Sequence, residues 1–244
     1  MDAMQVTKPI QLQPVLLDKR TLLDRHPVFR DLDRRLIERI VEHAVVRKVK
    51  GGTVLFRKGD EGSRLYAVLS GMVRISTGSS AGKDAVFTHI LPGEIFGEIA
   101  VLDGSTRSAD AATVDSCELM AIERRDFIPL LHEFPALGIR LIELLCARLR
   151  HTSEQVEDIV FLDLANRLAK VLLYLHDRAP SGTSQKPIRI TQRELSQMVG
   201  ATRESTNKQL RKWERSKVLK MDRGTLTLLA PGALIRLVSE DAAQ

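Results

Sequence analysis

The stretch that decides the fold of the C-terminal part is Thr191-Gln192-Arg193-Glu194-Leu195-Ser196-Gln197-Met198-Val199-Gly200-Ala201-Thr202-Arg203-Glu204. Its first threonine and Glu194, three positions later, fit a capping box at a helix start. The short helix that follows ends at Gly200, a typical C-terminal residue. Thr202 suits the cap of a second helix over Arg203 to about Ser216. Two helices joined by a tight glycine-containing turn predict a helix-turn-helix.

The second helix of such a motif meets base edges in the major groove with its first turns. Arg203 and Lys208 suit the O6 and N7 acceptors of guanine, and Glu204 suits the N4 donor of cytosine. Hydroxyl side chains are placed for phosphate contacts, which set register rather than sequence; they are Thr191, Thr202 and Ser205. The alternative is a small structural helical subdomain whose basic residues are only solvated.

Two β-rich runs, Val218–Met221 and Thr225–Leu229, follow this motif and flank Asp222-Arg223-Gly224. They predict a hairpin that acts as a wing. Residues 181–244 contain 12 Lys and Arg against 6 Asp and Glu, whereas the rest of the chain is balanced, so this part carries the whole net charge of +6. A basic end on a neutral body indicates a nucleic-acid-binding module, with a solvated basic face as the alternative.

Upstream, residues 135–162 predict one long helix. Five of its six heptad-seam positions are apolar, and Thr152 is the exception: Ile142, Leu145, Leu149, Thr152, Val156 and Ile159. This pattern indicates a two-helix seam or one face packed on the body, and Thr152 by itself is a tolerated seam residue. Another amphipathic helix, Leu164–His176, and a loop at Ala179–Ser184 complete this part.

Residues 46–126 contain short β-rich runs separated by glycine-containing turns: Thr53–Phe56, Leu65–Leu69, Val73–Ile75, Val86–Leu91, Ala109–Val114 and Glu118–Ile122. Many short strands predict an antiparallel jelly roll or barrel. Apolar residues at helical spacing indicate a helix near residues 32–40. The fold class is therefore α+β, with domains over 1–134 and 163–244 joined by the helix over 135–162.

One segment of the β-rich part, Gly97 to Ala109, carries groups for an anion. Gly97 permits close backbone approach, and a short helix that starts there aims free N–H groups at a phosphate. Arg107 returns to pair with the same phosphate, Ser108 adds a donor, and Glu98 accepts from a sugar hydroxyl. These groups suit a cyclic phosphodiester. Simple chain geometry and a surface Glu–Arg salt bridge are the alternatives.

Composition excludes several other classes. No apolar run approaches the roughly 18 residues of a membrane span. The N-terminal residues lack the pattern of a secretory signal. Two distant cysteines, Cys117 and Cys146, fit a reducing cytoplasm and provide no metal cluster. No nucleophile–base pair or metal-ligand spacing indicates an enzyme, and the six histidines are scattered.

The chain resembles the CRP/FNR family of bacterial transcription regulators along nearly its full length. The resemblance lies in three motifs in the family's order: Gly97–Ala109, Leu149–Val156 and Gly200–Glu204. It implies a cyclic-nucleotide-binding β jelly roll, a dimerisation helix and a winged helix-turn-helix. It further implies cAMP as allosteric effector, with cGMP as the alternative. Double-stranded DNA, a second copy of the chain and RNA polymerase (through residues 179–186) are the implied partners.

The resemblance also implies residue roles. The residues that bind the phosphate and ribose are Gly97, Glu98, Ile99, Arg107 and Ser108, and Arg148 supports this site from the long helix. Thr152 forms a hydrogen bond with the adenine, and this role replaces its interpretation as a tolerated seam residue. Ser153 reaches the nucleotide held by the partner subunit. Lys208 departs from the family's arginine and, as a single point donor, weakens discrimination at one guanine of a TGTGA-like half-site.

The expected function is a homodimeric, cyclic-nucleotide-gated transcription factor that binds near-palindromic DNA. The family's iron–sulfur and haem branches are disfavoured, because the N-terminus has no cysteine set and no axial ligands match. His89, His132 and His151 are expected to be structural or solvated. Two rivals stay open. One is a family member that binds DNA without cyclic nucleotide or with another effector, and the other is a cyclic-nucleotide-sensing regulatory subunit.

Overall fold

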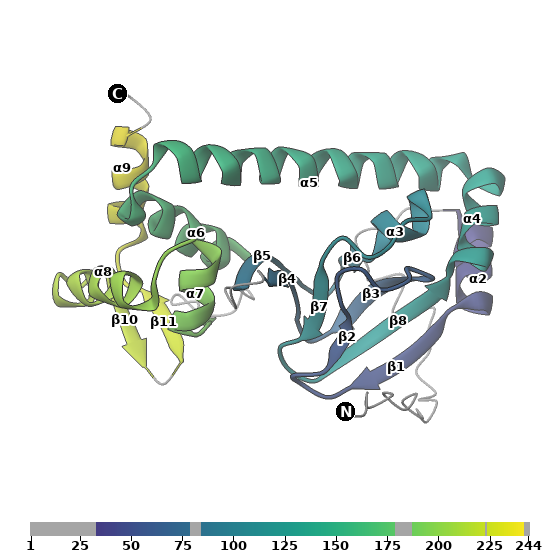
Figure 1. Ribbon diagram of the computed structural model, residues 1–244, viewed down its shortest axis with the longest axis horizontal. Coiled ribbons are helices and arrows are strands. Elements are labelled where there is room, and N and C mark those ends of the chain that lie inside the picture. The colour runs from purple at the N-terminus through teal and green to yellow at the C-terminus, as the bar shows by residue number, and fades with distance from the viewer. Residues whose placement is uncertain (1–32, 79–83, 179–186, 223, 242–244) are drawn as a thin grey trace, which may run out of the picture. The chain divides into compact units, whose positions relative to one another are not determined.

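The computed structural model describes residues 33–78, 84–178, 187–222 and 224–241 (Figure 1). The chain divides into two compact units. Residues up to Thr77 and Thr88–Glu143 form the first, and Gly78–Phe87 with Leu144–Gln244 form the second. The predicted loop at 179–186 and Arg223 of the predicted wing lie outside the described residues.

Two four-stranded sheets form the β-rich part of the described residues, and one of them includes Asp84–Phe87, which are grouped with the second unit. One has the order β1-β8-β3-β6, with β1 at Val45–Val49, β8 at Cys117–Glu123, β3 at Arg64–Ser70 and β6 at Ile95–Phe96. The other has the order β2-β7-β4-β5, with β2 at Val54–Phe56, β7 at Asp110–Thr113, β4 at Val73–Gly78 and β5 at Asp84–Ile90. The predicted β jelly roll is confirmed, and each of the six predicted runs overlaps a strand.

A shared apolar core joins the two sheets. Its buried members come from both: Val68, Val73, Ile90, Phe96, Ala111, Cys117 and Leu119. Burial of a side chain the size of valine or phenylalanine contributes about 1.5–3 kcal/mol. Strand β3 contains the apolar run Leu65–Leu69, of which Leu65, Ala67 and Val68 are buried, and this run was recognisable from sequence. The two-residue strand β6 is too short to give such a signal.

Three helices accompany the sheets. Helix α2 (Arg34–His43) is capped by Asp33 and buries Leu36, Ile37 and Ile40, as the helical spacing near residues 32–40 predicts. Helix α3 (Glu98–Asp103) follows β6. Helix α4 (Arg124–Glu133) was not predicted, because Pro129 inside it weakens the helical signal.

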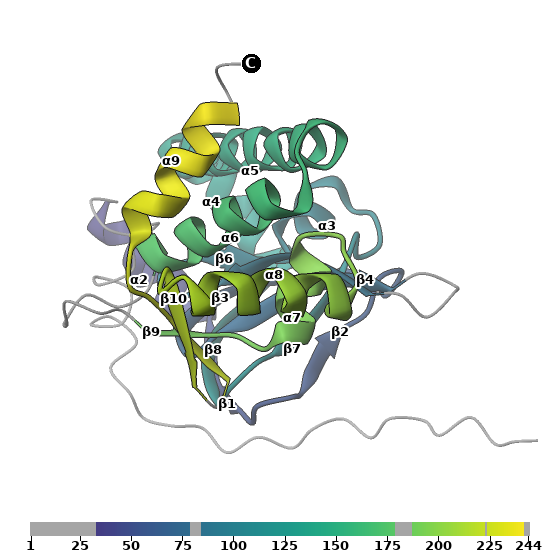
Figure 2. The same cartoon turned by 90° about the vertical axis from the view of Figure 1, so that its left-hand side faces the viewer.

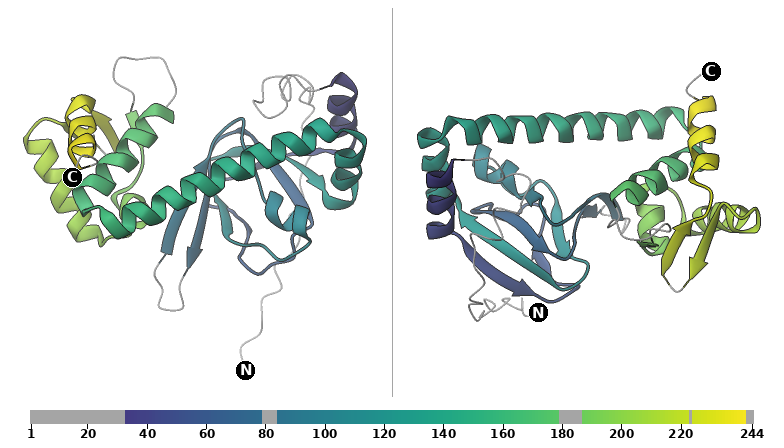
Figure 3. Two further views of the ribbon diagram at one scale, coloured as in Figure 1. Left: turned by 90° about the horizontal axis from the view of Figure 1, so that it is seen from above. Right: turned by 180° about the vertical axis from the view of Figure 1, so that it is seen from behind.

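Helix α5 (Pro135–Phe161) is one continuous helix, as predicted (Figure 3). Helix α6 (Leu164–Arg178) follows it at the predicted place. Four apolar seam residues of α5 remain exposed: Ile142 at 61%, Leu149 at 68%, Val156 at 56% and Ile159 at 59%. The seam is therefore not covered by the described residues of this chain.

The C-terminal part contains the predicted winged helix-turn-helix (Figure 2). Helices α7 (Gln192–Met198) and α8 (Arg203–Arg215) form the motif, and strands β10 (Leu219–Asp222) and β11 (Thr225–Leu228) form the wing hairpin. Strand β9 (Pro187–Arg189) and helix α9 (Pro231–Asp241) were not predicted. These helices and strands, together with α6, share one hydrophobic core that holds them together. Its buried members include Leu172, Leu195, Leu210, Trp213, Leu226 and Leu234.

Candidate functional site

Gly97 begins α3 in a conformation that only glycine adopts readily. Its φ of 76° is left-handed. A Cβ atom at this position would lie 2.6 Å from Nη1 of Arg107 and 3.2 Å from the carbonyl oxygen of Arg64. Both the backbone conformation and the lack of space therefore require glycine. The next residue, Glu98, is 1% exposed.

Arg107 lies directly against this helix start and is 4% exposed. Its Nη1 donates to the carbonyl oxygen of Gly97 at 2.8 Å, and its Nη2 donates to the carbonyl oxygen of Arg64 at 2.7 Å. The Nε atom is buried and has no hydrogen-bond partner within the described residues. A buried donor without a partner costs about 1–3 kcal/mol, so this N–H marks a place where an acceptor is missing.

The backbone of Arg107 is held by the turn between β2 and β3. The Arg107 N–H donates to the carbonyl oxygen of Asp60 at 2.8 Å, and the Gly59 N–H donates to the carbonyl oxygen of Arg107 at 2.9 Å. A Cβ atom at Gly62 would lie 2.1 Å from Cβ of Ala100 in α3. The glycine-containing turn Gly59–Gly62 indicates only a strand connection in the sequence, whereas in the structure it positions the arginine.

The charge at this place is a buried cation. Burial lowers the pKa of the Arg107 guanidinium, while Tyr66, Glu98 and Asp60 raise it. An arginine whose ordinary pKa is so high stays charged at neutral pH. We call Gly97, Glu98 and Arg107, with the Arg64 carbonyl, the anion cradle. It combines a fixed positive charge, a spare N–H donor and a buried carboxyl group.

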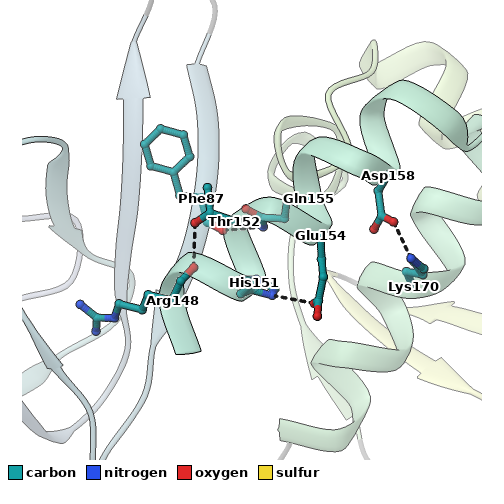
Figure 4. A network of polar contacts seen from close by, with 8 residues as sticks. All are labelled: Phe87, Arg148, His151, Thr152, Glu154, Gln155, Asp158 and Lys170. Carbon is teal, nitrogen blue, oxygen red and sulfur yellow. Dashed lines mark hydrogen bonds and ion pairs between the residues drawn. The ribbon is translucent and has the colours of Figure 1, made fainter. Parts of the chain in front are cut away.

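The other residues predicted for this ligand lie at different places. Ile99 is 43% exposed on α3, and Ser108 is exposed beside Arg107. Arg148, Thr152 and Ser153 lie on α5 in the second unit, where Thr152 and Ser153 are exposed. The Oγ1 hydroxyl of Thr152 donates to the carbonyl oxygen of Arg148 at 2.9 Å (Figure 4).

The helix-turn-helix has the predicted caps. The Thr191 side chain accepts from the Glu194 N–H at 3.1 Å, and the Glu194 carboxylate accepts from the Thr191 N–H at 3.0 Å, which completes the capping box. Thr202 Oγ1 accepts from the Ser205 N–H at 3.1 Å at the start of α8. Both hydroxyls are exposed, so their predicted phosphate contacts remain predictions.

Helix α8 presents its polar side chains outward. The side chains predicted to read bases or contact phosphate on this helix are all exposed: Arg203, Glu204, Ser205 and Lys208. Thr206, Leu210 and Trp213 are buried on the opposite face. An exposed basic face on a helix fixed by its own core is the arrangement that groove recognition needs.

Two family models match the chain. The cyclic nucleotide-binding domain matches residues 46–134, and the Crp-like helix-turn-helix domain matches residues 166–237. The cAMP-activated global transcriptional regulator CRP of Haemophilus influenzae is 32% identical over 176 residues, which cover 71% of this chain and 79% of that protein. The chain belongs to the CRP/FNR family of transcription regulators.

Other members of the CRP/FNR family are similarly related. The Cyclic AMP receptor protein of Thermus thermophilus is 30% identical over 200 residues, 82% of this chain and 91% of that protein. The structure of the c-di-GMP responsive global regulator CLP of Xanthomonas campestris superposes with a TM-score of 0.72 at 27% identity, over 80% of this chain and 99% of that one.

As a CRP/FNR member the chain is a DNA-binding regulator and not an enzyme. Within the described residues no group of three or more His, Cys, Asp or Glu side chains is placed to hold a metal ion. His89 is buried, and the His151 ring stacks on Tyr174 at 5.2 Å. In the part of the chain that the structure describes, no helix combines the length and apolarity of a membrane span.

Two sets of residues at these sites were not found from sequence. Phe56 and Tyr66 lie against the Arg107 guanidinium and Phe96 packs against both rings, although aromatic residues in three separate strands gave no sequence signal beyond strand formation. Glu214 of α8 accepts from the Met221 N–H of β10 at 3.1 Å and so ties the wing to the helix. Only the folded chain brings these residues together.

Proposed function

We propose that this CRP/FNR regulator is a homodimer that binds a cyclic nucleotide and, in that state, near-palindromic DNA. The observation that carries the first part is the buried Nε–H of Arg107, which has no partner among the described residues and lies beside the start of α3. A phosphate oxygen supplies the missing acceptor, and charge-assisted hydrogen bonds of this kind are strong. Glu98 takes the ribose hydroxyl, and Ile99, Ser108 and Arg148 line the ligand.

The hydroxyl of Thr152 supports adenine as the base. Its proton is donated to the Arg148 carbonyl oxygen, so its remaining lone pairs act as acceptors. Adenine presents an exocyclic amino donor where guanine presents an oxygen acceptor. An acceptor at position 152 therefore favours cAMP over cGMP. Ser153 reaches the nucleotide held by the partner subunit.

The exposed seam of α5 supports the homodimer. Ile142, Leu149, Val156 and Ile159 repeat at coiled-coil spacing, and each is more than half exposed. An exposed apolar stripe of this kind marks an interaction surface. Two copies of α5 that pack along it give a twofold dimer, which presents two recognition helices to two half-sites.

The proposed switch is a population shift. Nucleotide binding by the anion cradle, with Thr152 as a base contact, favours the dimer conformation in which both α8 helices face DNA. Arg203, Glu204 and Lys208 then read bases, and Thr191, Thr202 and Ser205 contact phosphates. We further propose that the regulator acts in the cytoplasm and has RNA polymerase as a partner.

Titration calorimetry with cAMP, cGMP and c-di-GMP, followed by DNA binding measured by fluorescence anisotropy, tests this proposal. We expect cAMP to bind, Arg107→Ala to lose most of that binding, and operator affinity to rise with cAMP and fall steeply with salt. Undiminished cAMP binding by Arg107→Ala overturns the assignment of the anion cradle as the phosphate site. DNA affinity that is indifferent to cAMP supports the rival without nucleotide gating, and a preference for c-di-GMP identifies another effector.

A further inference from the structure

Beyond these expected ligand contacts, we propose that Phe56 is a positioning residue of the anion cradle. Its ring fixes the plane of the Arg107 guanidinium, so that the buried Nε–H faces the phosphate. The inference rests on the proposed function for its ligand, but its geometry stands on the described residues alone. Phe56 contacts the Arg107 guanidinium, so the role assigned to it acts through Arg107.

The two backbone bonds of Arg107 do not fix the guanidinium by themselves. The acceptors, the carbonyl oxygens of Gly97 and Arg64, lie 2.8 Å and 2.7 Å from its two terminal nitrogens. The flexible side-chain stem still lets the group tilt about the line that joins these two bonds. A third constraint, applied to the flat face, limits this tilt and holds Nε in one direction.

Phe56 provides that third constraint. The guanidinium carbon lies 4.2 Å from the centroid of the Phe56 ring, with the cation over the ring face. The corresponding distance to the Tyr66 ring is 5.9 Å, so Phe56 makes the closer contact. Attraction between a cation and a ring face strengthens when water is excluded, and Arg107 is only 4% exposed.

The Phe56 ring, which forms an aromatic floor beneath the guanidinium, is itself held in place. The ring of Phe56 lies 6.0 Å from both Tyr66 and Phe96, and those two rings stack at 5.1 Å with 14° between their planes. Phe96 is 1% exposed in the core. The aromatic cluster therefore joins the hydrophobic core to the cation, and it limits tilting of Phe56 as well as of Arg107.

A flat aromatic floor differs chemically from an aliphatic one. Leucine fills similar space but has no negative ring face for the cation. A carboxylate in this place would hold the guanidinium more tightly, but it would also neutralise the charge that a phosphate needs. An aromatic ring orients the cation and leaves its charge available to the anion.

The first test compares Phe56→Leu with Phe56→Tyr, which keeps a ring face, and with Phe127→Leu, a matched change at a buried phenylalanine of α4 that is 2% exposed. We expect Phe56→Leu to weaken cAMP binding about tenfold, and both other variants to stay within about twofold of the unchanged protein. Thermal unfolding of all three separates folding from binding. Phe56→Leu with unchanged affinity overturns the inference.

The second test needs no nucleotide. In an NMR spectrum of arginine side chains, the Arg107 Nε–H signal, assigned by its absence from Arg107→Lys, should be shifted upfield by the Phe56 ring current. The shift should persist in Phe56→Tyr and disappear in Phe56→Leu. If the shift is absent from the unchanged protein, the inference fails. If the shift is present but no cyclic nucleotide binds, the positioning of Arg107 is supported and the proposed function fails.

Discussion

The carbonyl oxygen of Gly97 accepts a 2.8 Å hydrogen bond from Arg107, a residue ten positions further along the chain. The same nitrogen lies 2.6 Å from where a Cβ atom at position 97 would be. A single glycine thus supplies both the bond that holds the guanidinium and the space that the guanidinium occupies. The helix start and the arginine form one unit that tolerates no side chain between them.

Gly97→Ala is expected to abolish most cAMP binding, because the added methyl group displaces the Arg107 guanidinium. The left-handed φ adds strain of about 1–3 kcal/mol. Gly52→Ala is the matched control, since Gly52 has a φ of 77° but nothing within 4 Å of its Cβ position. Calorimetry should show binding lost in the first variant and kept in the second. Equal affinities in both would contradict the steric role of position 97.

Gly62→Ala should destabilise the first unit by about 1–3 kcal/mol, because its Cβ would overlap Cβ of Ala100 at 2.1 Å. Gly138→Ala makes the same chemical change in α5, where nothing lies within 4 Å, and should raise stability through better helix propensity. Thermal unfolding of the two variants should therefore shift in opposite directions. A Gly62→Ala midpoint at or above that of the unchanged protein would show that the turn gives way without cost.

Thr152→Val should reduce the preference for cAMP over cGMP about tenfold, since valine keeps the shape but removes the acceptor (about 1.4 kcal/mol). The ratio of the two dissociation constants is the quantity to measure. Thr152→Ser keeps an acceptor that is bonded in the same way and should retain the preference. A ratio that Thr152→Val leaves unchanged would assign base selection to another residue.

Burial raises the pKa of the Cys117 thiol from 9.0 to about 11, with a further contribution from Asp115. Between these two pH values the unfolded chain loses this proton while the folded protein keeps it. The contribution to stability is therefore fully present below pH 9 and is lost as pH rises toward about 11. Urea unfolding across this range should show the decline, and Cys117→Ala should flatten it.

In the folded protein at pH 8, iodoacetamide should modify the exposed Cys146 first.

Glu214→Ala should weaken DNA binding several-fold while the recognition residues stay intact, because the Met221 N–H of the wing loses its acceptor on α8. Glu214→Gln keeps an oxygen acceptor but loses the ion pair with Arg211, and should bind DNA almost normally. Anisotropy at several salt concentrations measures both. If both variants bind equally weakly, the ion pair matters rather than the link to the wing.

Local sequence patterns determined the helix-turn-helix, because its signals act over three or four residues. The Thr191 and Glu194 cap, the Gly200 stop and the Thr202 cap all occur in the structure as predicted. The long helix over 135–162 was equally clear from its apolar periodicity. Helix α4 and strand β6 were not, since Pro129 weakens the helical signal of the first and the second has only two residues.

The sequence by itself determined the order of the elements and the basic C-terminal part, and it indicated candidate residues for an anion site, because each is a property of neighbouring residues. Only the tertiary structure decided that Arg107 lies on Phe56 and donates to the backbone carbonyls of Gly97 and Arg64. The contacts with Phe56 and Arg64 join residues tens of positions apart, and no local spacing encodes them. They form because the sheets that carry these residues share one core, and burial of that core selects the pairing.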